Sequence, residues 1–168
     1  MIENIGSLFT EQSQSYAQGA YQLALQHRHS TIEEAHMFLT LLHQPDELLS
    51  QLFSNMSLDV EDLKQQIARA MKSIRKVPFW KGRNYKFFAT PIVKRSLEGA
   101  VNIARELGEE KASSIHIFWG IVNSSLQEEQ NGMAQILRKN NITTEQVFEA
   151  LKKVKYDSLD NDGSEKEE

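Results

Sequence analysis

The sequence predicts an all-α fold in which two copies of a four-helix unit form one domain of about eight helices with pseudo-twofold symmetry. Three observations support this prediction. Apolar residues recur at three- and four-residue spacing along most of the 168-residue chain, which is the spacing of one helix face. Helix-capping residues stand before these stretches, and residues of the first half match residues of the second at a constant offset.

The first unit, residues 9–75, contains four predicted helices. Thr10 is a suitable N-cap for the first helix, and a polar turn after His27 ends it. Pro45 ends the second helix or opens the third, and Asp59 belongs to the capping segment of the fourth. The expected helices cover residues 10–27, 33–43, 46–55 and 59–75.

The second unit, residues 90–156, repeats this order. Thr90 is the expected N-cap of its first helix, and Pro91 occupies the first helical position. Gly108 suits the left-handed residue that ends this helix. The later features are Ser113 as cap of the second helix, residues 127–140 as the third helix, and Thr143 or Thr144 as cap of the fourth. No stretch between these caps has the pattern of a strand.

The match between the two units extends beyond apolar positions. At an offset of 80, Gly19-Ala20 matches Gly99-Ala100, and His36 matches His116. Beyond the second helix the offset becomes 84, which places a four-residue insertion in the loop before the third helix of the second unit. Unrelated amphipathic helices match by chance at apolar positions, but they do not share glycines, caps and a histidine. The duplication is therefore taken as real.

Five segments follow from this organisation. They are a loose N-terminal arm (1–8), the first repeat (9–75), a connector (76–89), the second repeat (90–156) and an acidic tail or linker (157–168).

The connector has an unusual composition. The segment from Lys64 to Arg95 carries ten of the 19 Lys and Arg residues and none of the 23 acids, although the net charge is −4. Such a block is either a solvated face or a site for an acidic partner. The aromatic side chains of the connector allow three interpretations. They could cover the joint between the repeats, form a rim that contacts an acidic or amphipathic peptide, or stack on single-stranded nucleic acid. The aromatic residues concerned are Phe79, Trp80, Phe87 and Phe88.

Two stretches carry a resemblance to a known family. His29–Leu42 and its counterpart Leu107–Val122 each combine the end of a helix, a short turn and a histidine-containing apolar helix. Together with the Phe9-Thr10 opening and the Thr90-Pro91 restart, they resemble the N-terminal domain of Clp-type AAA+ chaperones and unfoldases. The resemblance covers residues 8–154.

The resemblance implies a binding domain that is not an enzyme and needs no cofactor. In this family the domain precedes two ATPase rings and captures substrate or adaptor proteins. The implied partners are unfolded or helical peptide segments, the full ATPase is a homohexamer, and the isolated domain is a monomer. The 168 residues contain no Gly-x-x-x-x-Gly-Lys-Ser/Thr loop for nucleotide phosphates, so we expect the front end of a larger ATPase or a freestanding adaptor.

The subfamily stays open between two alternatives. Leu41–Asp46 is similar to the same stretch in the ATPases that dismantle type VI secretion sheaths, where the domain binds a sheath-protein peptide. A general disaggregase is the other alternative. The sequence departs from the family at Arg28, where glycine is common, at Trp119-Gly120, and along the connector.

We expect an apolar groove between the two repeats to accept a hydrophobic or helical segment. The residues predicted to bind the partner are Thr10, Phe79, Trp80, Tyr85 and Phe87, with Lys81, Arg83 and Lys86 supplying charge complementarity.

Other classes of function have weaker support. The chain has no cysteine, so a metal site would need His and carboxylate ligands, and Glu33 with His36 supplies one arm of a di-iron motif without the other three. We expect His36 and His116 to pack inward and the site to hold no metal. Neither a nucleophile elbow, a secretory signal nor a membrane-spanning run occurs, and we expect a cytoplasmic protein that binds no membrane and no nucleic acid.

Overall fold

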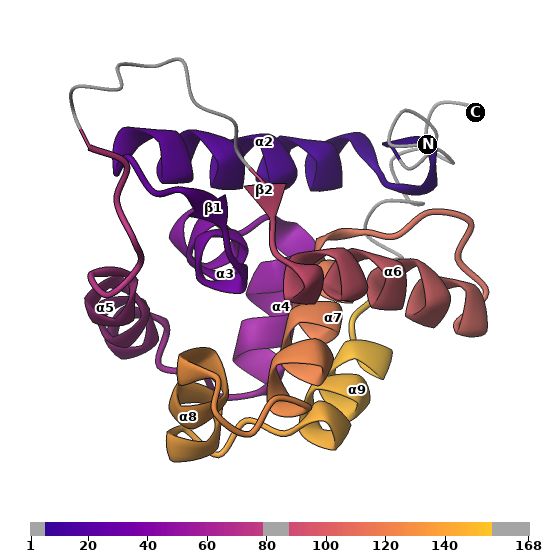
Figure 1. Ribbon diagram of the computed structural model, residues 1–168. Coiled ribbons are helices and arrows are strands. Elements are labelled where there is room, and N and C mark those ends of the chain that lie inside the picture. The colour runs from indigo at the N-terminus through magenta and orange to yellow at the C-terminus, as the bar shows by residue number, and fades with distance from the viewer. Residues whose placement is uncertain (1–5, 79–87, 156–168) are drawn as a thin grey trace.

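The computed structural model describes residues 6–78 and 88–155 and confirms the all-α fold (Figure 1). In these two ranges there are eight α-helices, one 3-10 helix and two short strands. In chain order they are η1 (Gly6–Leu8), α2 (Glu11–Gln26), β1 (Thr31–Ile32), α3 (Glu34–His43), α4 (Glu47–Asn55), α5 (Val60–Met71), β2 (Phe88–Ala89), α6 (Pro91–Glu106), α7 (Ser114–Leu126), α8 (Gly132–Lys139) and α9 (Thr144–Lys152). Helices α2–α5 belong to the first repeat and α6–α9 to the second.

The third helix of the second repeat is shorter than predicted. It begins at Gly132 rather than at residue 127, because Asn131 is its N-cap and accepts a hydrogen bond from the Met133 N–H (2.8 Å). Part of the insertion instead lengthens α7, which runs to Leu126 and has 13 residues against the 10 of α3. The insertion therefore lies partly in a helix and not only in a loop.

The expectation that the chain has no strand was wrong at two places. Strands β1 and β2 pair in parallel, with Ile32 opposite Ala89, and Phe9 forms a parallel bridge with Ala112. These pairs are equivalent, because residues 9 and 32 correspond to residues 89 and 112 at the offset of 80. Each repeat thus uses the segment before its first helix to pair with the loop of the other repeat.

The turns of the two repeats also agree in backbone conformation. Arg28 has φ +54° and Gly108 has φ +82°, and both end the first helix of their repeat. Ser57 (φ +50°) and Asn141 (φ +58°) are equivalent in the same way before the fourth helix. Arg28 therefore adopts the left-handed conformation that glycine adopts more easily.

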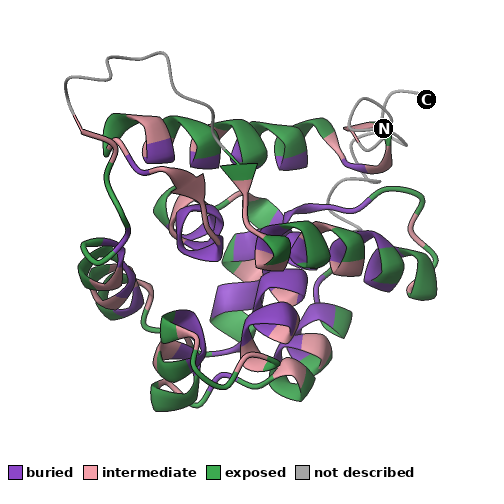
Figure 2. Cartoon of the chain, in the orientation of Figure 1, coloured by how far each residue is buried: buried purple, intermediate pink, exposed green. Residues whose placement is uncertain are grey.

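One hydrophobic core joins both repeats (Figure 2). Phe38 of α3 and Phe118 of α7 are fully buried, and their ring centroids lie 4.8 Å apart. These two residues are equivalent at the offset of 80, so the pseudo-twofold axis passes close to their contact. Phe53 of α4 packs on Phe118 from the side, with 5.4 Å between the centroids.

His36 and His116 are buried, as the sequence predicted. Each accepts a hydrogen bond at Nδ1 from the backbone N–H at the start of its helix, from Glu33 (2.9 Å) and Ser113 (2.8 Å) respectively. Burial lowers the pKa of His36 to about 4, with the nearby His29 as a second cause, and burial lowers the pKa of His116 to about 4. Both imidazoles are therefore neutral helix-start caps at neutral pH.

These caps predict an acid-sensitive fold. In the unfolded chain both imidazoles take up a proton below about pH 6.5, whereas in the folded chain they stay neutral down to about pH 4. The unfolded state then binds more protons, so the free energy of unfolding falls between these values, by on the order of 3 kcal/mol for each histidine. Urea unfolding followed by circular dichroism at pH 7, 5.5 and 4.5 measures this slope.

His116→Asn tests the assignment, because its amide oxygen can accept the Ser113 N–H but does not titrate. We expect a lower stability at pH 7 and a flatter slope than in the wild type. An unchanged slope would show that His116 does not cause the acid sensitivity.

Candidate functional site

An open groove lies on the first repeat, between α2 and α5, with α3 beneath it. Its volume is about 600 Å³. Helix α3 packs against both α2 and α5 and so fixes the distance between the two lips. From α2 the groove is lined chiefly by Gln12, Ser15, Tyr16, Gly19, Leu23 and Gln26. Leu39 and Thr40 come from α3, and Lys64 and Ala68 come from α5.

The α2 lip of the open groove carries no charged side chain. Its polar members are glutamines, a serine and the hydroxyl of Tyr16. That hydroxyl donates to the Gln44 carbonyl oxygen (2.6 Å) and accepts from the Asp46 N–H (2.8 Å), which ties α2 to the end of α3. Burial, followed by the nearby Asp46 charge, raises the pKa of Tyr16, so this tie keeps its proton at neutral pH.

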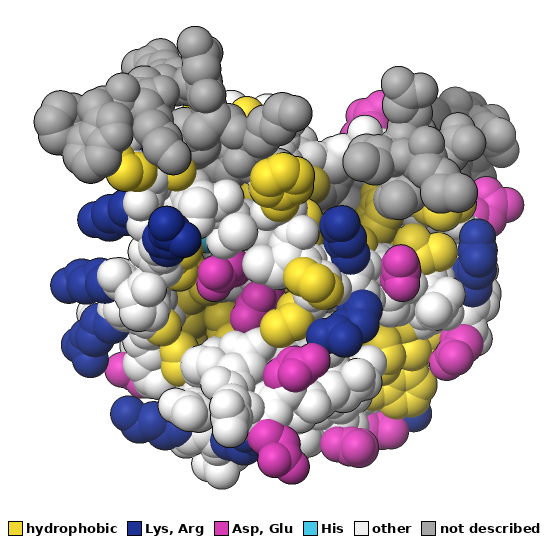
Figure 3. Space-filling model, viewed as in Figure 1, with side chains coloured by type: hydrophobic (Ala, Val, Ile, Leu, Met, Phe, Trp, Pro, Cys, Tyr) yellow, Lys and Arg dark blue, Asp and Glu magenta, His cyan; other side chains and the backbone are white. Residues whose placement is uncertain are grey.

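The α5 lip is charged. Lys64 Nζ lies 2.8 Å from Glu61 Oε1, and both residues line the groove. Toward its C-terminal end this helix exposes only basic residues and neutral ones. Figure 3 shows Lys and Arg side chains gathered along the edge of the molecule where α5 lies. The exposed basic residues at the end of α5 and just after it are Arg69, Lys72, Arg75 and Lys76.

The second repeat has an equivalent hollow, which is largely filled. It lies between α6, α7 and α9 and has a volume of about 270 Å³. Six of its seven lining residues correspond to lining residues of the open groove at the offsets of 80 and 84. The corresponding pairs are Leu23 and Ile103, Gln26 and Glu106, Leu39 and Trp119, Glu61 and Glu145, Lys64 and Phe148, and Gln65 and Glu149.

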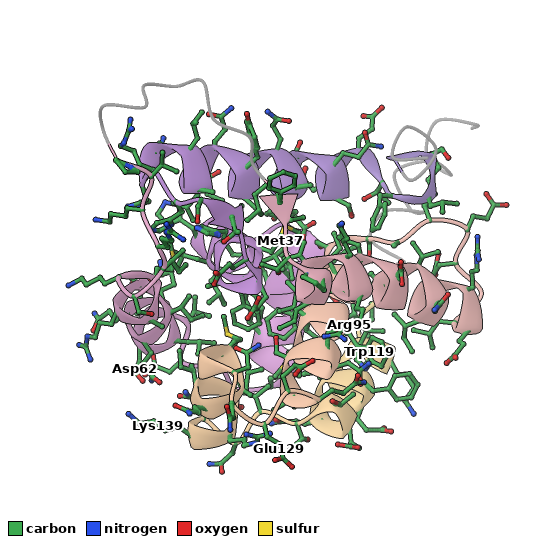
Figure 4. All side chains as sticks on the ribbon, in the orientation of Figure 1. Met37, Asp62, Arg95, Trp119, Glu129 and Lys139 are labelled. Carbon is green, nitrogen blue, oxygen red and sulfur yellow. The ribbon has the colours of Figure 1, made fainter. Side chains whose placement is uncertain are left out.

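Two exchanges in that correspondence explain why the second hollow is filled. Trp119 stands where the first repeat has Leu39, and Phe148 stands where it has Lys64. Figure 4 shows Trp119 on the side of α7 that lies toward α6 and α9. Its Cζ3 lies 3.7 Å from the position that a Cβ on Gly99 would take, so the indole packs along α6. The two rings occupy space that Leu39 and Lys64 leave open.

A third exchange sets the spacing of the helices. A Cβ on Gly120 would clash with the backbone carbonyl of Ser96, so α7 touches α6 backbone to backbone. The equivalent residue in the first repeat is Thr40, whose Cγ2 lies 2.8 Å from the position of a Cβ on Gly19. Because threonine carries a side chain where Gly120 has none, α2 cannot approach α3 as closely as α6 approaches α7. The groove on the first repeat stays open for this reason.

The joint between the repeats holds a different, acidic hollow of about 350 Å³. Glu33, Glu34 and Glu128 line it, and burial followed by the charge of Glu34 raises the pKa of Glu33. Glu34 accepts from Asn131 Nδ2 (2.9 Å), and Glu128 pairs with Arg95 (2.8 Å). The hollow at the joint is thus lined by acidic side chains, whereas the open groove lies within the first repeat. The apolar groove expected between the repeats stays a prediction.

Thr10 is the predicted partner-binding residue that the structure describes. It is the N-cap of α2, where Oγ1 accepts from the Ser13 N–H (3.2 Å) and donates to Ser13 Oγ (2.9 Å). Its own N–H donates to the Ala112 carbonyl (3.0 Å), so Thr10 lies at the joint and not in the open groove. The other predicted residues, Phe79, Trp80, Lys81, Arg83, Tyr85, Lys86 and Phe87, lie outside the described residues.

The described flanks of the connector are held by the first repeat. Arg28 donates from its guanidinium to the carbonyls of Val77 (3.3 Å) and Pro78 (2.7 Å). Its backbone carbonyl accepts from the Val77 N–H (2.6 Å). The connector therefore starts beside the C-terminal end of α2, which is also one end of the open groove. Phe88 at the other flank is 66% exposed, so its ring does not cover the joint as one interpretation of the sequence proposed.

The buried His29 and His36 are hydrogen bonded to each other. His36 Nε2 lies 2.7 Å from His29 Nδ1, and His36 Nδ1 already accepts the Glu33 N–H. The proton between the two rings is therefore on His36 Nε2. Among residues 6–78 and 88–155, no three or more His, Asp or Glu residues come together to hold a metal ion. In the same ranges no helix is long and apolar enough to cross a membrane.

The model of the Clp repeat (R) N-terminal domain family matches residues 8–140. The chain belongs to this family. Among curated relatives, ClpB of Bacillus anthracis is 25% identical over 146 residues, which are 87% of this chain and 16% of that protein. ClpB of Clostridium perfringens is 25% identical over 149 residues, 86% of this chain and 17% of that protein. The chain thus spans about a sixth of the length of these relatives.

Solved structures of the Clp repeat fold agree with the helix arrangement. The Hsp104 N-terminal domain from Candida albicans has a TM-score of 0.68 at 14% identity, covering 86% of this chain and 89% of that chain. The N-terminal domain of ClpV1 from the type VI secretion system of E. coli has a TM-score of 0.67 at 18% identity, covering 88% of each chain. A ClpV N-domain in complex with a VipB peptide has a TM-score of 0.66 at 18% identity, covering 84% of each. These likenesses establish the fold.

The open groove was not predicted from the sequence, although three exchanges between the Clp repeats signal it. Thr40 against Gly120, Leu39 against Trp119 and Lys64 against Phe148 all lie at equivalent positions. Trp119-Gly120 stood out as a departure from the family pattern, but its effect on helix spacing becomes visible only in the structure.

Gly120→Ala tests the close approach of α6 and α7. The new methyl group would clash with the Ser96 carbonyl, so we expect the variant to lose roughly 2–4 kcal/mol of stability despite the better helix propensity of alanine. For a domain of this size, this loss lowers Tm by about 5–15 °C. Differential scanning calorimetry measures it.

Gly132→Ala is the matched control, because a Cβ there has no neighbour within 4 Å. We expect its Tm to stay the same or rise slightly. Equal Tm values for the two variants would contradict the close helix contact.

Proposed function

We propose that this chain is the peptide-binding N-terminal domain of a Clp-type AAA+ ATPase. In this role it captures segments of substrate or adaptor proteins and presents them to ATPase modules for unfolding, disaggregation or sheath disassembly. Support comes from membership of the Clp repeat family and from the match to ClpB relatives, of whose length the chain covers about a sixth. The 168 residues also contain no nucleotide-binding loop.

The single observation that carries the proposal is the open groove of about 600 Å³ on the first repeat. Its Leu23, Leu39 and Ala68 surface is apolar, and its lips offer amide and hydroxyl groups that can bind a backbone. The solved ClpV N-domain with a VipB peptide is a domain of this fold that holds a peptide.

We expect the domain to bind an unfolded protein and not its folded form. Reduced and carboxymethylated α-lactalbumin, which stays unfolded, should shift backbone amide signals of the ¹⁵N-labelled domain in a saturable manner. Native α-lactalbumin is the matched control and should leave the spectrum unchanged.

Two outcomes would contradict the proposal. One is an unchanged spectrum with the unfolded protein at millimolar concentration. The other is saturable binding of a single-stranded oligonucleotide at 150 mM salt, since such binding depends on the basic block and falls steeply with salt.

The connector residues predicted from the sequence are proposed to form a rim beside the groove. Trp80→Ala should weaken binding of unfolded α-lactalbumin by about tenfold, because aromatic anchors carry much of the binding energy at such sites. Fluorescence anisotropy measures the affinity. Lys139→Ala, on the exposed C-terminal end of α8, is the control and should not change it. An unchanged affinity for the Trp80 variant would remove Trp80 from the rim.

A further inference from the structure

Resting on the proposed function, we infer that the open groove receives an amphipathic helix of the partner through a large aromatic side chain, at the place that Trp119 and Phe148 fill in the second repeat. The partner helix carries acidic residues on the flank that faces α5. This assigns the binding surface to one repeat and specifies the chemistry of its occupant.

The second repeat shows which side chains fit this hollow, because its own Trp119 and Phe148 occupy it. Both repeats use equivalent positions of their first, second and fourth helices to build the hollow. In the second repeat two rings fill it, and about 270 Å³ remains; in the first, Leu39 and Lys64 leave about 600 Å³. Leu39 and Lys64 thus leave open a site that two rings occupy in the second repeat, and an aromatic side chain of a partner fits there.

The dimensions of the groove suit a helix. The lining residues of α2 run from Gln12 to Gln26, which at a rise of about 1.5 Å per residue is a length of about 21 Å. A partner helix of about four turns has the same length. Ala68 is a small residue on the α5 lip, so it allows a helix backbone to come close there. Binding of an apolar helix face in a groove is a common mode of peptide recognition.

The charges of the two lips give the partner its orientation. Lining residues of α5 lie at Glu61, Lys64, Gln65 and Ala68, which is one helix face. Lys72 follows Ala68 by four residues and continues this face, and Arg69 is exposed beside it. The α2 lining carries no Asp, Glu, Lys or Arg, and in the α5 lining Glu61 and Lys64 pair with each other. The net positive charge on this side of the groove therefore comes from the exposed Arg69 and Lys72 beside the lining. Acidic residues on one flank of the partner and neutral residues on the other complement this arrangement.

The inference can be tested by giving the first repeat the side chains of the second. Leu39→Trp and Lys64→Phe together should fill the groove, since the equivalent rings already fit between α6, α7 and α9. The probe is a fluorescein-labelled helical peptide of about 16 residues made of Ala, Gln and Glu, with one Trp and two Leu on one face. The double variant should bind it at least about tenfold more weakly than the wild type, with a helical circular dichroism spectrum retained.

Two control variants and two control peptides accompany this variant. Lys64→Gln removes the charge without adding a ring, so it should weaken binding less than the double variant does. Ser54→Trp adds an indole on the exposed face of α4, away from the groove, and should bind as the wild type does. A peptide with Ala in place of its Trp should bind at least about tenfold more weakly. A peptide with Lys in place of Glu should also bind more weakly, and more so at low salt.

The outcomes separate the two proposals. If the folded double variant binds the peptide as tightly as the wild type does, or if loss of the peptide Trp has no effect, the groove assignment is wrong. If unfolded α-lactalbumin still binds the wild type in that case, the proposed function stands. If the wild type binds neither probe, the proposed function itself fails.

A double variant that does not fold is replaced by mapping on the wild type. The peptide should then shift amide signals of α2, α3 and α5, and not those of α6, α7 and α9. Shifts confined to the second repeat would overturn the inference.

Discussion

The reciprocal pairing of the two repeats is the constraint on which the rest of the structure depends. The Thr10 N–H donates to the Ala112 carbonyl and the Thr90 N–H donates to the Ile32 carbonyl, and each N···O distance is 3.0 Å. Each first helix is therefore capped by a residue that the other repeat holds in place. The Phe38–Phe118 contact lies between these two pairs and closes the core. Because α2 is fixed in this way at its N-terminal end, and by Arg28 and the connector at its C-terminal end, it can stand away from α5 without losing its position.

Differences between the repeats then arise from side chains on a shared backbone. The turns at Arg28 and Gly108 adopt the same left-handed conformation, so a change of residue type there does not alter the path of the chain. At the second helix, in contrast, the change between Thr40 and Gly120 alters how closely the first helix packs. Close packing with an indole fills the hollow of the second repeat, whereas looser packing leaves the first repeat a surface groove.

Most of the fold could be predicted from the sequence, because its signals are local. Thr90-Pro91 and Ser113 indicate helix starts, and Gly108 indicates a helix end, because of the conformations that these residues favour. The strands escaped prediction because each has two residues, too few for an alternating pattern. The start of α8 was misplaced because the polar residues before Asn131 have high helix propensity but no apolar face to bury.

The candidate site was less predictable, since it depends on distances between helices. The sequence directed attention to the aromatic connector, whose residues 79–87 lie outside the described part of the chain, and their role stays a prediction. The groove depends instead on the size of single residues such as Thr40 and Leu39, which look ordinary on an amphipathic helix.

The crossed pairing of Phe9 with Ala112 and of Ile32 with Ala89 has a consequence for smaller pieces of this protein. The arrangement has the form of an isologous interface, in which one patch meets its own equivalent. A polypeptide with a single unit could make these pairs only by meeting a second copy, so the chain is the covalent form of a symmetric dimer. The connector joins two partners that would otherwise depend on concentration to find each other. Since the link removes the need for identical halves, one half can have Trp119 and Phe148 where the other has Leu39 and Lys64.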